Sequence, residues 1–288
     1  MNIFDFSPYY NENTIAKIKI EENSSNGIIT CVTESNRTFR YEPKNYNFEF
    51  SEKSDYCKYF KIDGNKHFVG KKMRISRHPW FIKFEVNPWK NEEIQRNIAS
   101  KQVNVKKNDI VILSDIDEIL DRKKIPDIIK LVNIHGIITV PLRVNIFYFN
   151  LVCTKWVGPP NYSYKIFIMT GEYFNNLKMT SDELRKKGES GQLIEKIYCH
   201  NEFCGYHLSW IGDYMNAVKK LNAYSHSKSD HMNEIYNNDG TINKDILNNR
   251  IKNGMPIFYN QTLEIQNDLP LLESIKTRKD EFSDLFIR

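Results

Sequence analysis

An uninterrupted apolar run leads directly into a cluster of carboxylates in the middle of this chain. Residues 110–113 are Ile-Val-Ile-Leu, and the next five positions include Asp115, Asp117 and Glu118. A strand without polar alternation is typical of a sheet that other elements cover on both faces. The pattern therefore predicts an α/β fold in which carboxylates project from the end of a buried central strand.

Oxygen ligands at the end of a rigid strand suit Mg²⁺ or Mn²⁺, which bind through one or two carboxylates together with substrate phosphates. Acidic groups this close together repel one another, and a cation is the usual compensation. In a second interpretation, Asp115, Asp117, Glu118 and Asp121 only solvate a loop and charge-cap the next helix. The position directly after a buried strand favours the metal site.

Length and composition indicate an ordinary globular protein. The chain has 288 residues, of which 40% are hydrophobic and 27% charged. Because no internal repeat or low-complexity linker divides it, we predict a single domain over residues 1–288. The net charge of +5 is spread along the chain without a basic block, so the sequence does not predict a nucleic-acid partner.

The sequence predicts a soluble cytoplasmic protein. No window contains the 18 or more apolar residues of a membrane span, and the N-terminus lacks the pattern of a signal peptide. Five cysteines, an odd number, are scattered along the chain, which fits reduced thiols better than disulfides. The oligomeric state is not readable from the sequence.

Several further elements are predicted from periodicity and end signals. Residues 28–32 form a strand that leads into the polar residues Glu34, Ser35, Asn36 and Arg37, at the edge where open α/β sheets bind ligands. A solvated loop would have the same composition. Other strands are expected at residues 144–149 and 164–170, and helices at residues 91–103, after Pro126, from a cap at Ser181 to about Gly188, at 213–224 and at 241–253.

Haloacid-dehalogenase-type phosphatases also place an Asp-x-Asp motif after an apolar strand, and use the first Asp as a nucleophile. That class normally carries Thr or Val shortly after the second Asp, whereas Glu118 and Ile119 stand here. No second carboxylate follows Asp213 in the register of its distal acidic motif. This class is therefore a weaker alternative.

Five ordered segments together resemble glycosyltransferase family 17, which includes β-1,4-mannosyl-glycoprotein N-acetylglucosaminyltransferases. The segments are residues 4–12 (FDFSPYYNE), 34–39 (ESNRTF), 95–97 (QRN), 114–119 (SDIDEI) and 205–210 (GYHLSW), with a weaker similarity at Lys220 and His226. The resemblance covers about residues 2–258 and leaves residues 259–288 as a C-terminal extension. Leu120 and Tyr206 depart from the residues usual in the family.

The resemblance implies a fold and an activity. The fold would be GT-A-like, a Rossmann-related three-layer sandwich with a mixed, mostly parallel central sheet. The activity would be inverting transfer of a sugar, with GlcNAc expected, from a UDP-sugar to a glycan or glycoconjugate acceptor, with Mn²⁺ or Mg²⁺. A non-catalytic carbohydrate- or nucleotide-binding protein of the same fold is the alternative from another class.

The resemblance also assigns roles to particular residues. The implied metal ligands are Asp117, Asp115, His207 and His226. The implied donor-binding residues are Glu34, Ser35, Asn36, Arg37, Arg96 and Asp115. The candidates for catalytic groups are Glu118, Asp213 and His207, and Trp156 and Trp210 are candidates for stacking on a sugar. A zinc site at Cys199, His200, Cys204 and His207 is disfavoured because the spacing fits no standard pattern.

Overall fold

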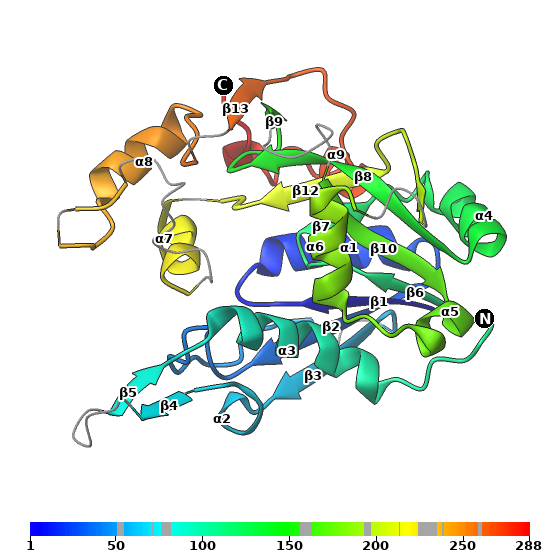
Figure 1. The fold of residues 1–288 in the computed structure, drawn as a ribbon. Coiled ribbons are helices and arrows are strands. Elements are labelled where there is room, and N and C mark those ends of the chain that lie inside the picture. The colour runs from blue at the N-terminus through cyan, green and yellow to red at the C-terminus, as the bar shows by residue number, and fades with distance from the viewer. Residues whose placement is uncertain are drawn as a thin grey trace.

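The computed structural model describes residues 1–50, 55–70, 72–75, 82–155, 163–192, 197–212, 214–223, 235–237, 239–258 and 261–288. Within these residues the chain alternates between strands and helices (Figure 1). The predicted loop around Trp156 lies outside the described residues, as do Asp213 and His226.

The helices and strands have the following bounds. The strands are β1 (Ile3–Pro8), β2 (Ile28–Ser35), β3 (Cys57–Ile62), β4 (Lys72–Ile75), β5 (Ile82–Glu85), β6 (Ile110–Leu113), β7 (Glu118–Leu120), β8 (Ile137–Ile146), β9 (Leu151–Lys155), β10 (Ser163–Thr170), β11 (Tyr198–Cys199), β12 (Gly205–Ser209) and β13 (Thr262–Ile265). The helices are α1 (Asn13–Ser24), α2 (Gly64–His67), α3 (Pro88–Gln102), α4 (Ile125–His135), α5 (Gly171–Asn176), α6 (Ser181–Ser190), α7 (Tyr214–Ala223), α8 (Lys244–Lys252) and α9 (Glu273–Lys276), with a 3₁₀ turn at Ser283–Leu285.

A mixed sheet of eleven strands organises the described residues. Its main order is β13-β9-β8-β10-β6-β1-β2-β3, and β7, β11 and β12 pair beside this path. The strands β6, β1, β2 and β3 are parallel, whereas β10 runs antiparallel between β6 and β8. The predicted α/β class with a mixed central sheet is confirmed.

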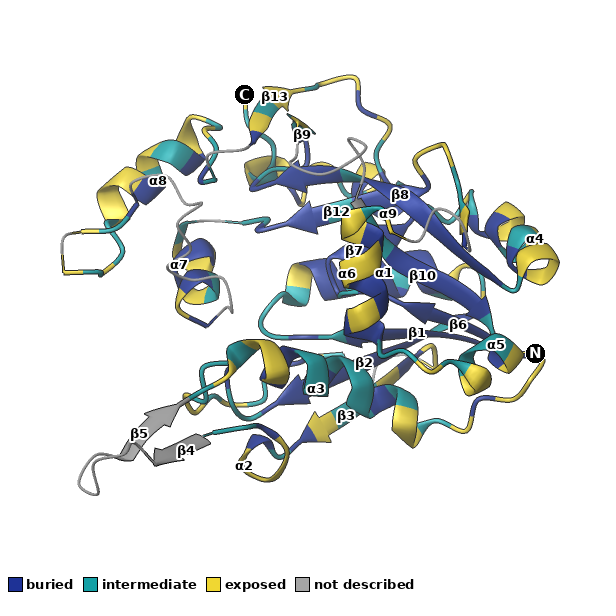
Figure 2. Cartoon of the chain, in the orientation of Figure 1, coloured by how far each residue is buried: buried dark blue, intermediate teal, exposed yellow. Residues whose placement is uncertain are grey.

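Helices cover both faces of this sheet, as the apolar run at residues 110–113 predicts. Ile110 and Ile112 pack in a cluster with residues of α4, while Val111 and Leu113 pack on the other face in a cluster with residues of α3 and α6. All four side chains are buried, and the buried strands lie between helical layers in Figure 2. Continuous apolar sequence is therefore explained by burial on two faces.

Several predicted element ends need correction. The predicted strand at residues 144–149 is the last part of β8, which begins at Ile137 and ends at Ile146 because Phe147 has a left-handed φ of 64°. The cap of α6 is Thr180, one residue before the predicted Ser181. Thr180 accepts a hydrogen bond from the backbone of Glu183, and the Glu183 side chain bonds back to the Thr180 backbone.

The C-terminal residues pack into the core of the domain. Strand β13 pairs with β9, and Leu272, Ile275 and Phe282 are buried against α1 and β12 residues. The backbone N–H of Ser274 donates to the buried carboxylate of Glu22 at 2.8 Å. This segment therefore contributes to the same hydrophobic core as the central sheet.

Two properties expected of the chain are visible in the described residues. All five cysteines are free thiols. No helix among the described residues has both the length and the apolar character needed to cross a membrane.

Candidate active site

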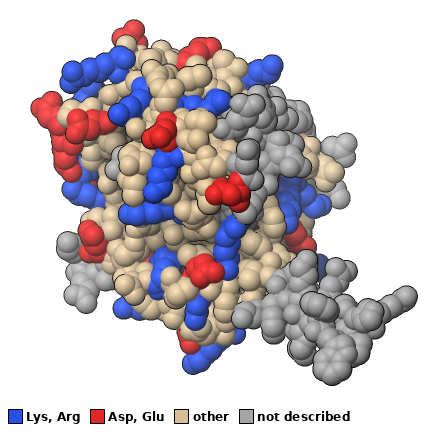
Figure 3. Space-filling model, turned by 90° about the vertical axis from the view of Figure 1, so that its left-hand side faces the viewer, with Lys and Arg blue, Asp and Glu red and all other residues tan. Residues whose placement is uncertain are grey.

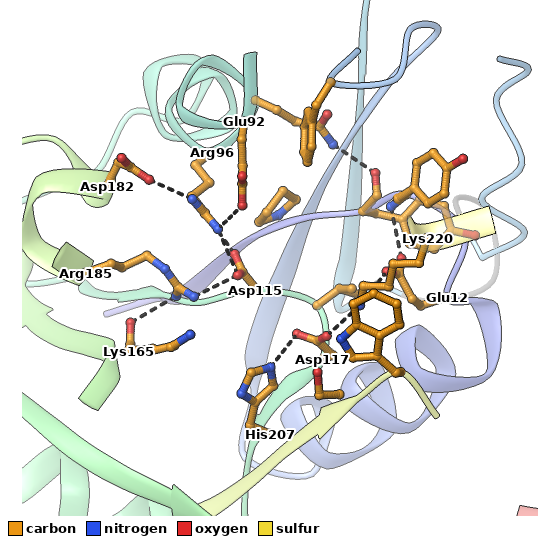
Figure 4. A pocket seen from close by; sticks show the side chains of 18 of the residues that line it. Glu12, Glu92, Arg96, Asp115, Asp117, Lys165, Asp182, Arg185, His207 and Lys220 are labelled. Carbon is orange, nitrogen blue, oxygen red and sulfur yellow. Dashed lines mark hydrogen bonds and ion pairs between the residues drawn. The ribbon is translucent and has the colours of Figure 1, made fainter. Parts of the chain in front are cut away.

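A cavity of about 540 Å³ borders the carboxyl ends of β1 and β6 and the adjacent β12. Strands of the parallel part of a sheet end on the same side, and open α/β sheets bind ligands there. Figure 4 shows how side chains from separate elements point toward this space. The labelled residues lining it are Glu12, Glu92, Arg96, Asp115, Asp117, Lys165, Asp182, Arg185, His207 and Lys220.

Asp115, the first carboxylate of the cluster, lies between two guanidinium groups. Arg96 on α3 donates from Nε to Oδ1 and from Nη2 to Oδ2, both at 3.0 Å. Arg185 on α6 donates from Nη2 to Oδ2 at 2.7 Å. Burial alone would raise the pKa of Asp115, but the two arginines outweigh it and hold the pKa far below its usual value. Both oxygens are thus already engaged by cations.

Glu118, a predicted catalytic residue, lies behind the cavity wall. Its side chain is fully buried, and Arg185 donates to both of its oxygens at 2.8 Å. The backbone N–H of Asp115 also donates to it at 2.8 Å. Glu118 does not line the cavity, so the geometry supports a positioning role for it in place of direct contact with a substrate.

Arg96 connects three elements at one edge of the cavity. Besides Asp115, it donates to Glu92 on α3 at 2.6 Å and to Asp182 on α6 at 2.7 Å. Burial alone would lower the pKa of Arg96, but Asp115 and Glu92 raise it well above the usual value. Such a buried, charge-assisted network holds α3 and α6 against the end of β6.

Asp117, the second carboxylate, has a different environment. Lys220 on α7 donates to Oδ2 at 3.1 Å, and Nε2 of His207 on β12 lies 3.6 Å from Oδ1. Lys220 also lies 3.4 Å from Oε1 of Glu12. His207 is placed here because β12 pairs antiparallel with β7, which directly follows Asp117. This group faces the cavity and combines two anions with two basic side chains.

Burial sets the charge states at this centre. It lowers the pKa of His207 below 6.5, although the nearby Asp117 carboxylate opposes the shift. Burial alone would raise the pKa of Asp117, but Lys220 and His207 outweigh it and lower the pKa. Near neutral pH the site therefore presents an ionised carboxylate beside a neutral imidazole.

Lys19 on α1 supports the loop that carries both aspartates. Its ammonium group is completely buried and donates to Ser114 Oγ at 2.6 Å and to the carbonyl oxygens of Asp115 and Glu118 at 2.8 and 2.9 Å. Asp5 on β1 lies 3.2 Å away. Three donor hydrogens and a paired carboxylate satisfy the buried charge, which fixes the geometry of the loop.

The predicted donor-binding residues 34–37 do not line this cavity. Glu34 is fully buried and accepts hydrogen bonds from Lys44, Tyr59 and the backbone of the following loop. Ser35 accepts from the Arg37 backbone, and Asn36 accepts from the Gly64 backbone. The Arg37 guanidinium donates to Asn65 at 2.7 and 3.0 Å. These four residues organise the edge of the sheet beside the cavity.

The sequence profile of glycosyltransferase family 17 matches residues 1–260. The chain belongs to glycosyltransferase family 17. Membership implies a nucleotide-sugar donor and a sugar-accepting substrate, and it argues against the phosphatase alternative. The environment of Asp115 agrees, because an aspartate with both oxygens held by arginines is poorly suited to act as a nucleophile.

Solved structures give only a distant similarity to this family 17 glycosyltransferase. The chain is similar to the crystal structures of S. aureus TarS 1-349 and S. aureus TarS, with 11% and 12% identity and TM-scores of 0.41 and 0.40. The similarity covers 77% of this chain in both cases, but only 63% and 40% of the TarS chains. A comparison with curated protein sequences found no match.

The family resemblance implies a divalent metal, and two side chains of this family 17 glycosyltransferase have the chemistry to hold one. Asp117 Oδ1 and His207 Nε2 are one carboxylate oxygen and one ring nitrogen facing the same cavity, and the lowered pKa values favour an ionised carboxylate and a neutral imidazole, which has one nitrogen available to a metal. No group of three or more His, Cys, Asp or Glu side chains suited to a metal occurs in the described part of the chain. The residues therefore fit an ion that also takes substrate phosphates and water as ligands.

Several site residues escaped prediction. Glu12, Lys165, Asp182 and Arg185 line the cavity, although only Glu12 lies in a segment that carries the family resemblance. Lys220 was noted only as a weak similarity. A signal existed for Glu12, because it follows the end of β1 by four positions, where a sheet of this class binds ligands. No local pattern identifies Arg185.

Proposed function

We propose that this family 17 glycosyltransferase transfers a sugar, with GlcNAc as the expected unit, from a UDP-sugar to a hydroxyl group of a glycan acceptor. The reaction would be an inverting displacement that depends on Mn²⁺ or Mg²⁺. Family membership supports the transferase class, whereas the donor, the metal and the inversion are inferred from the family resemblance and from the chemistry of the cavity.

One observation carries this proposal: Asp117, His207 and Lys220 converge on the cavity at the end of β6. An ionised carboxylate and a neutral imidazole are suitable ligands for a divalent ion. An ammonium group within 3.1 Å of the same carboxylate adds positive charge where a diphosphate would lie. A nucleoside diphosphate with its metal is the ligand class that matches this combination of charges.

Asp117 and His207 would hold the metal, which supplies electrostatic stabilisation to the diphosphate as the bond to the sugar breaks. Lys220 offers donor hydrogens to phosphate oxygens from α7. Asp115 keeps the arginines of α3 and α6 at the cavity edge, and Glu118 fixes Arg185 from behind. These contacts preorganise the charges before the substrate binds, which is the usual origin of electrostatic catalysis.

An acceptor hydroxyl must lose its proton as it attacks the sugar. The sequence offers two carboxylates for this role, Asp213 and Glu118, without a choice between them, and Asp213 lies outside the described residues. Glu118 is poorly placed to take this proton, because both of its oxygens accept hydrogen bonds from Arg185 and the residue does not line the cavity. His207 is better suited to hold the metal, since one of its nitrogens faces Asp117.

The face toward which β1, β2 and β12 run carries charges of both signs on its described residues. Figure 3 views this side, and its Lys and Arg side chains are interspersed with Asp and Glu. A nucleic-acid-binding surface usually has a continuous basic patch or stripe. The described part of this face has no such continuous patch in Figure 3.

The proposed function is tested by incubating the protein with a panel of UDP-sugars and Mn²⁺ and measuring released UDP. We expect release from at least one donor, and a loss of roughly 100-fold or more in Asp117→Asn, because one metal-binding carboxylate becomes a neutral amide. Asp127→Asn is the matched control, since Asp127 is exposed on α4 and lies outside the cavity. Equal activity of Asp117→Asn and Asp127→Asn would refute the assigned role of Asp117.

A further inference from the structure

One wall of the cavity has features that the proposed metal and diphosphate site does not use. Trp210 follows β12, Phe258 follows α8, and Gln261 immediately precedes β13, and all three line the cavity. The Trp210 and Phe258 rings lie edge to face with centroids 6.3 Å apart. Gln261 is bonded to Phe258 through its backbone N–H at 3.4 Å. Gln261 also lies just beyond the segment that the family profile matches.

The Gln261 side chain is unusual because its amide has no partner. The residue is only 8% exposed, and neither Nε2 nor Oε1 forms a hydrogen bond. Buried polar groups in proteins are nearly always paired, because burying one without a partner costs its hydration. An amide in a cavity wall is therefore expected to find its partners on a bound molecule or on water.

The backbone beside this amide is also strained. Trp210 has a φ of 62° and Phe147 has a φ of 64°, a left-handed conformation that bulky residues rarely adopt. The two residues lie at the adjacent ends of β12 and β8, where Phe147 donates to the Ser209 carbonyl at 3.1 Å and accepts from the Gly212 N–H at 3.2 Å. Strain of this kind concentrates at ligand-binding sites because the surrounding structure is needed to maintain it.

The location relative to Asp117 indicates which ligand this wall would contact. Tyr9 and Tyr10 line the cavity at the end of β1, on one side of the carboxylates that follow β6. Trp210, at the end of β12, lines the same cavity, with Lys220 Nζ 5.7 Å from its ring centroid. A pyranose ring held at Trp210 would therefore lie next to a diphosphate bound at Asp117 and Lys220, near the sugar that this diphosphate carries.

We propose that Trp210, Phe258 and Gln261 form a subsite for a neutral pyranose ring of the acceptor. An aromatic surface suits the apolar C–H face of such a ring, and an amide supplies one acceptor and two donors for its hydroxyls. Ligand pockets are commonly lined by apolar and aromatic side chains, and a few polar groups among them fix the orientation of the ligand. The assignment of this sugar to the acceptor rests on the proposed glycosyl transfer, but the subsite itself is testable as a sugar-binding site.

The test uses the full chain and saturation-transfer NMR with methyl glycosides of glucose, galactose, mannose and N-acetylglucosamine, with and without UDP and Mn²⁺. We expect at least one glycoside to bind the wild type at millimolar concentration. Gln261→Leu should weaken that binding tenfold or more and leave UDP affinity unchanged, because the lost hydrogen bonds belong to the glycoside. Gln102→Leu, on an exposed residue that ends α3, is the matched control.

Three results would overturn the subsite. The first is that no glycoside binds the wild type. The second is that Gln261→Leu binds the glycosides as well as the wild type does, as expected if the amide pairs only with internal water. The third is that Gln261→Leu loses affinity for UDP but keeps its affinity for the glycosides, because this wall would then bind the nucleotide.

Thermal unfolding separates these outcomes from misfolding. Gln261→Leu should melt no lower than the wild type, since it removes two unpaired polar atoms, and Gln261→Met repeats the test with an unbranched side chain. UDP binding to the wild type is measured separately from glycoside binding. If UDP does not bind, the proposed function is rejected, but the existence of the sugar subsite is still decided by the glycoside measurements.

Discussion

Lys19 shows how much one residue outside the cavity contributes to the site. Its buried ammonium group holds the carbonyl oxygens of Asp115 and Glu118 and pairs with Asp5. We expect Lys19→Met to lower the free energy of unfolding by about 3–5 kcal/mol, because Asp5 is left as an unpaired buried charge. Lys17→Met is the control, since Lys17 is exposed on the same helix. Urea unfolding of both variants checks this, and equal stabilities would contradict it.

Asp115 gives the site a defined dependence on pH. Its pKa in the folded protein lies below the unfolded value of 3.8, so the ionised form stabilises the fold. This stability is complete above pH 3.8 and is lost as the pH falls below that value toward the folded-state pKa. We expect urea unfolding between about pH 5 and pH 3 to show a steeper loss for the wild type than for Asp115→Asn. Parallel pH profiles would show that Asp115 is not held as described.

At the scale of single residues, the sequence predicted the acidic cluster and His207 but not their partners. Asp115 and Asp117 were recognisable because they follow an apolar strand, which is a local signal. Arg185 was not, because it reaches Asp115 across 70 positions of the chain. Arg37 was predicted to bind the donor. An Arg in a polar loop has the same local sequence pattern whether its guanidinium binds phosphate or, as here, donates to Asn65.

At the scale of elements, helix α6 is attached to the site through Arg185. The guanidinium binds Asp115 and Glu118, and Arg96 binds Asp182 on the same helix. We expect Arg185→Leu to leave the buried Glu118 carboxylate without its cation and Asp115 with Arg96 alone, which costs about 3 kcal/mol or more and speeds amide hydrogen exchange along α6. Lys187→Leu, at an exposed position of α6, should do neither. Unchanged exchange in Arg185→Leu would contradict this role.

Elements with strong local signals were predicted well, and those defined by tertiary pairing were not. The strand at residues 110–113 agrees with β6, and Pro126 lies in the first turn of α4 as expected. The short strands β7 and β12 were not predicted, because β7 exists mainly through its pairing with β12, and β12 through its pairing with β7 and β8. That pairing places His207 beside Asp117. The family resemblance implied that the two residues share a site, but no local sequence pattern predicted the pairing that brings them together.

At the scale of the whole molecule, the residues after the family-matched segment complete the core. Leu272 is fully buried in the cluster that includes Ile15, Ile119 and Leu208 from α1, β7 and β12. We expect Leu272→Ala to lower the free energy of unfolding by about 2–5 kcal/mol through loss of packing. Ile265→Ala is the control, because Ile265 is 47% exposed on β13. A loss below about 1 kcal/mol for Leu272→Ala would mean that this segment is only loosely attached.

Calorimetric titration of the full chain with UDP, in the presence and absence of Mn²⁺, tests the central claim most directly. We expect UDP to bind at least tenfold more tightly with Mn²⁺, and expect that gain to disappear in Asp117→Asn, since Asp117 and His207 would share the ion with the diphosphate. If UDP affinity is the same with and without Mn²⁺, or if Asp117→Asn retains the full gain, the proposed metal–nucleotide site at the end of β6 is wrong.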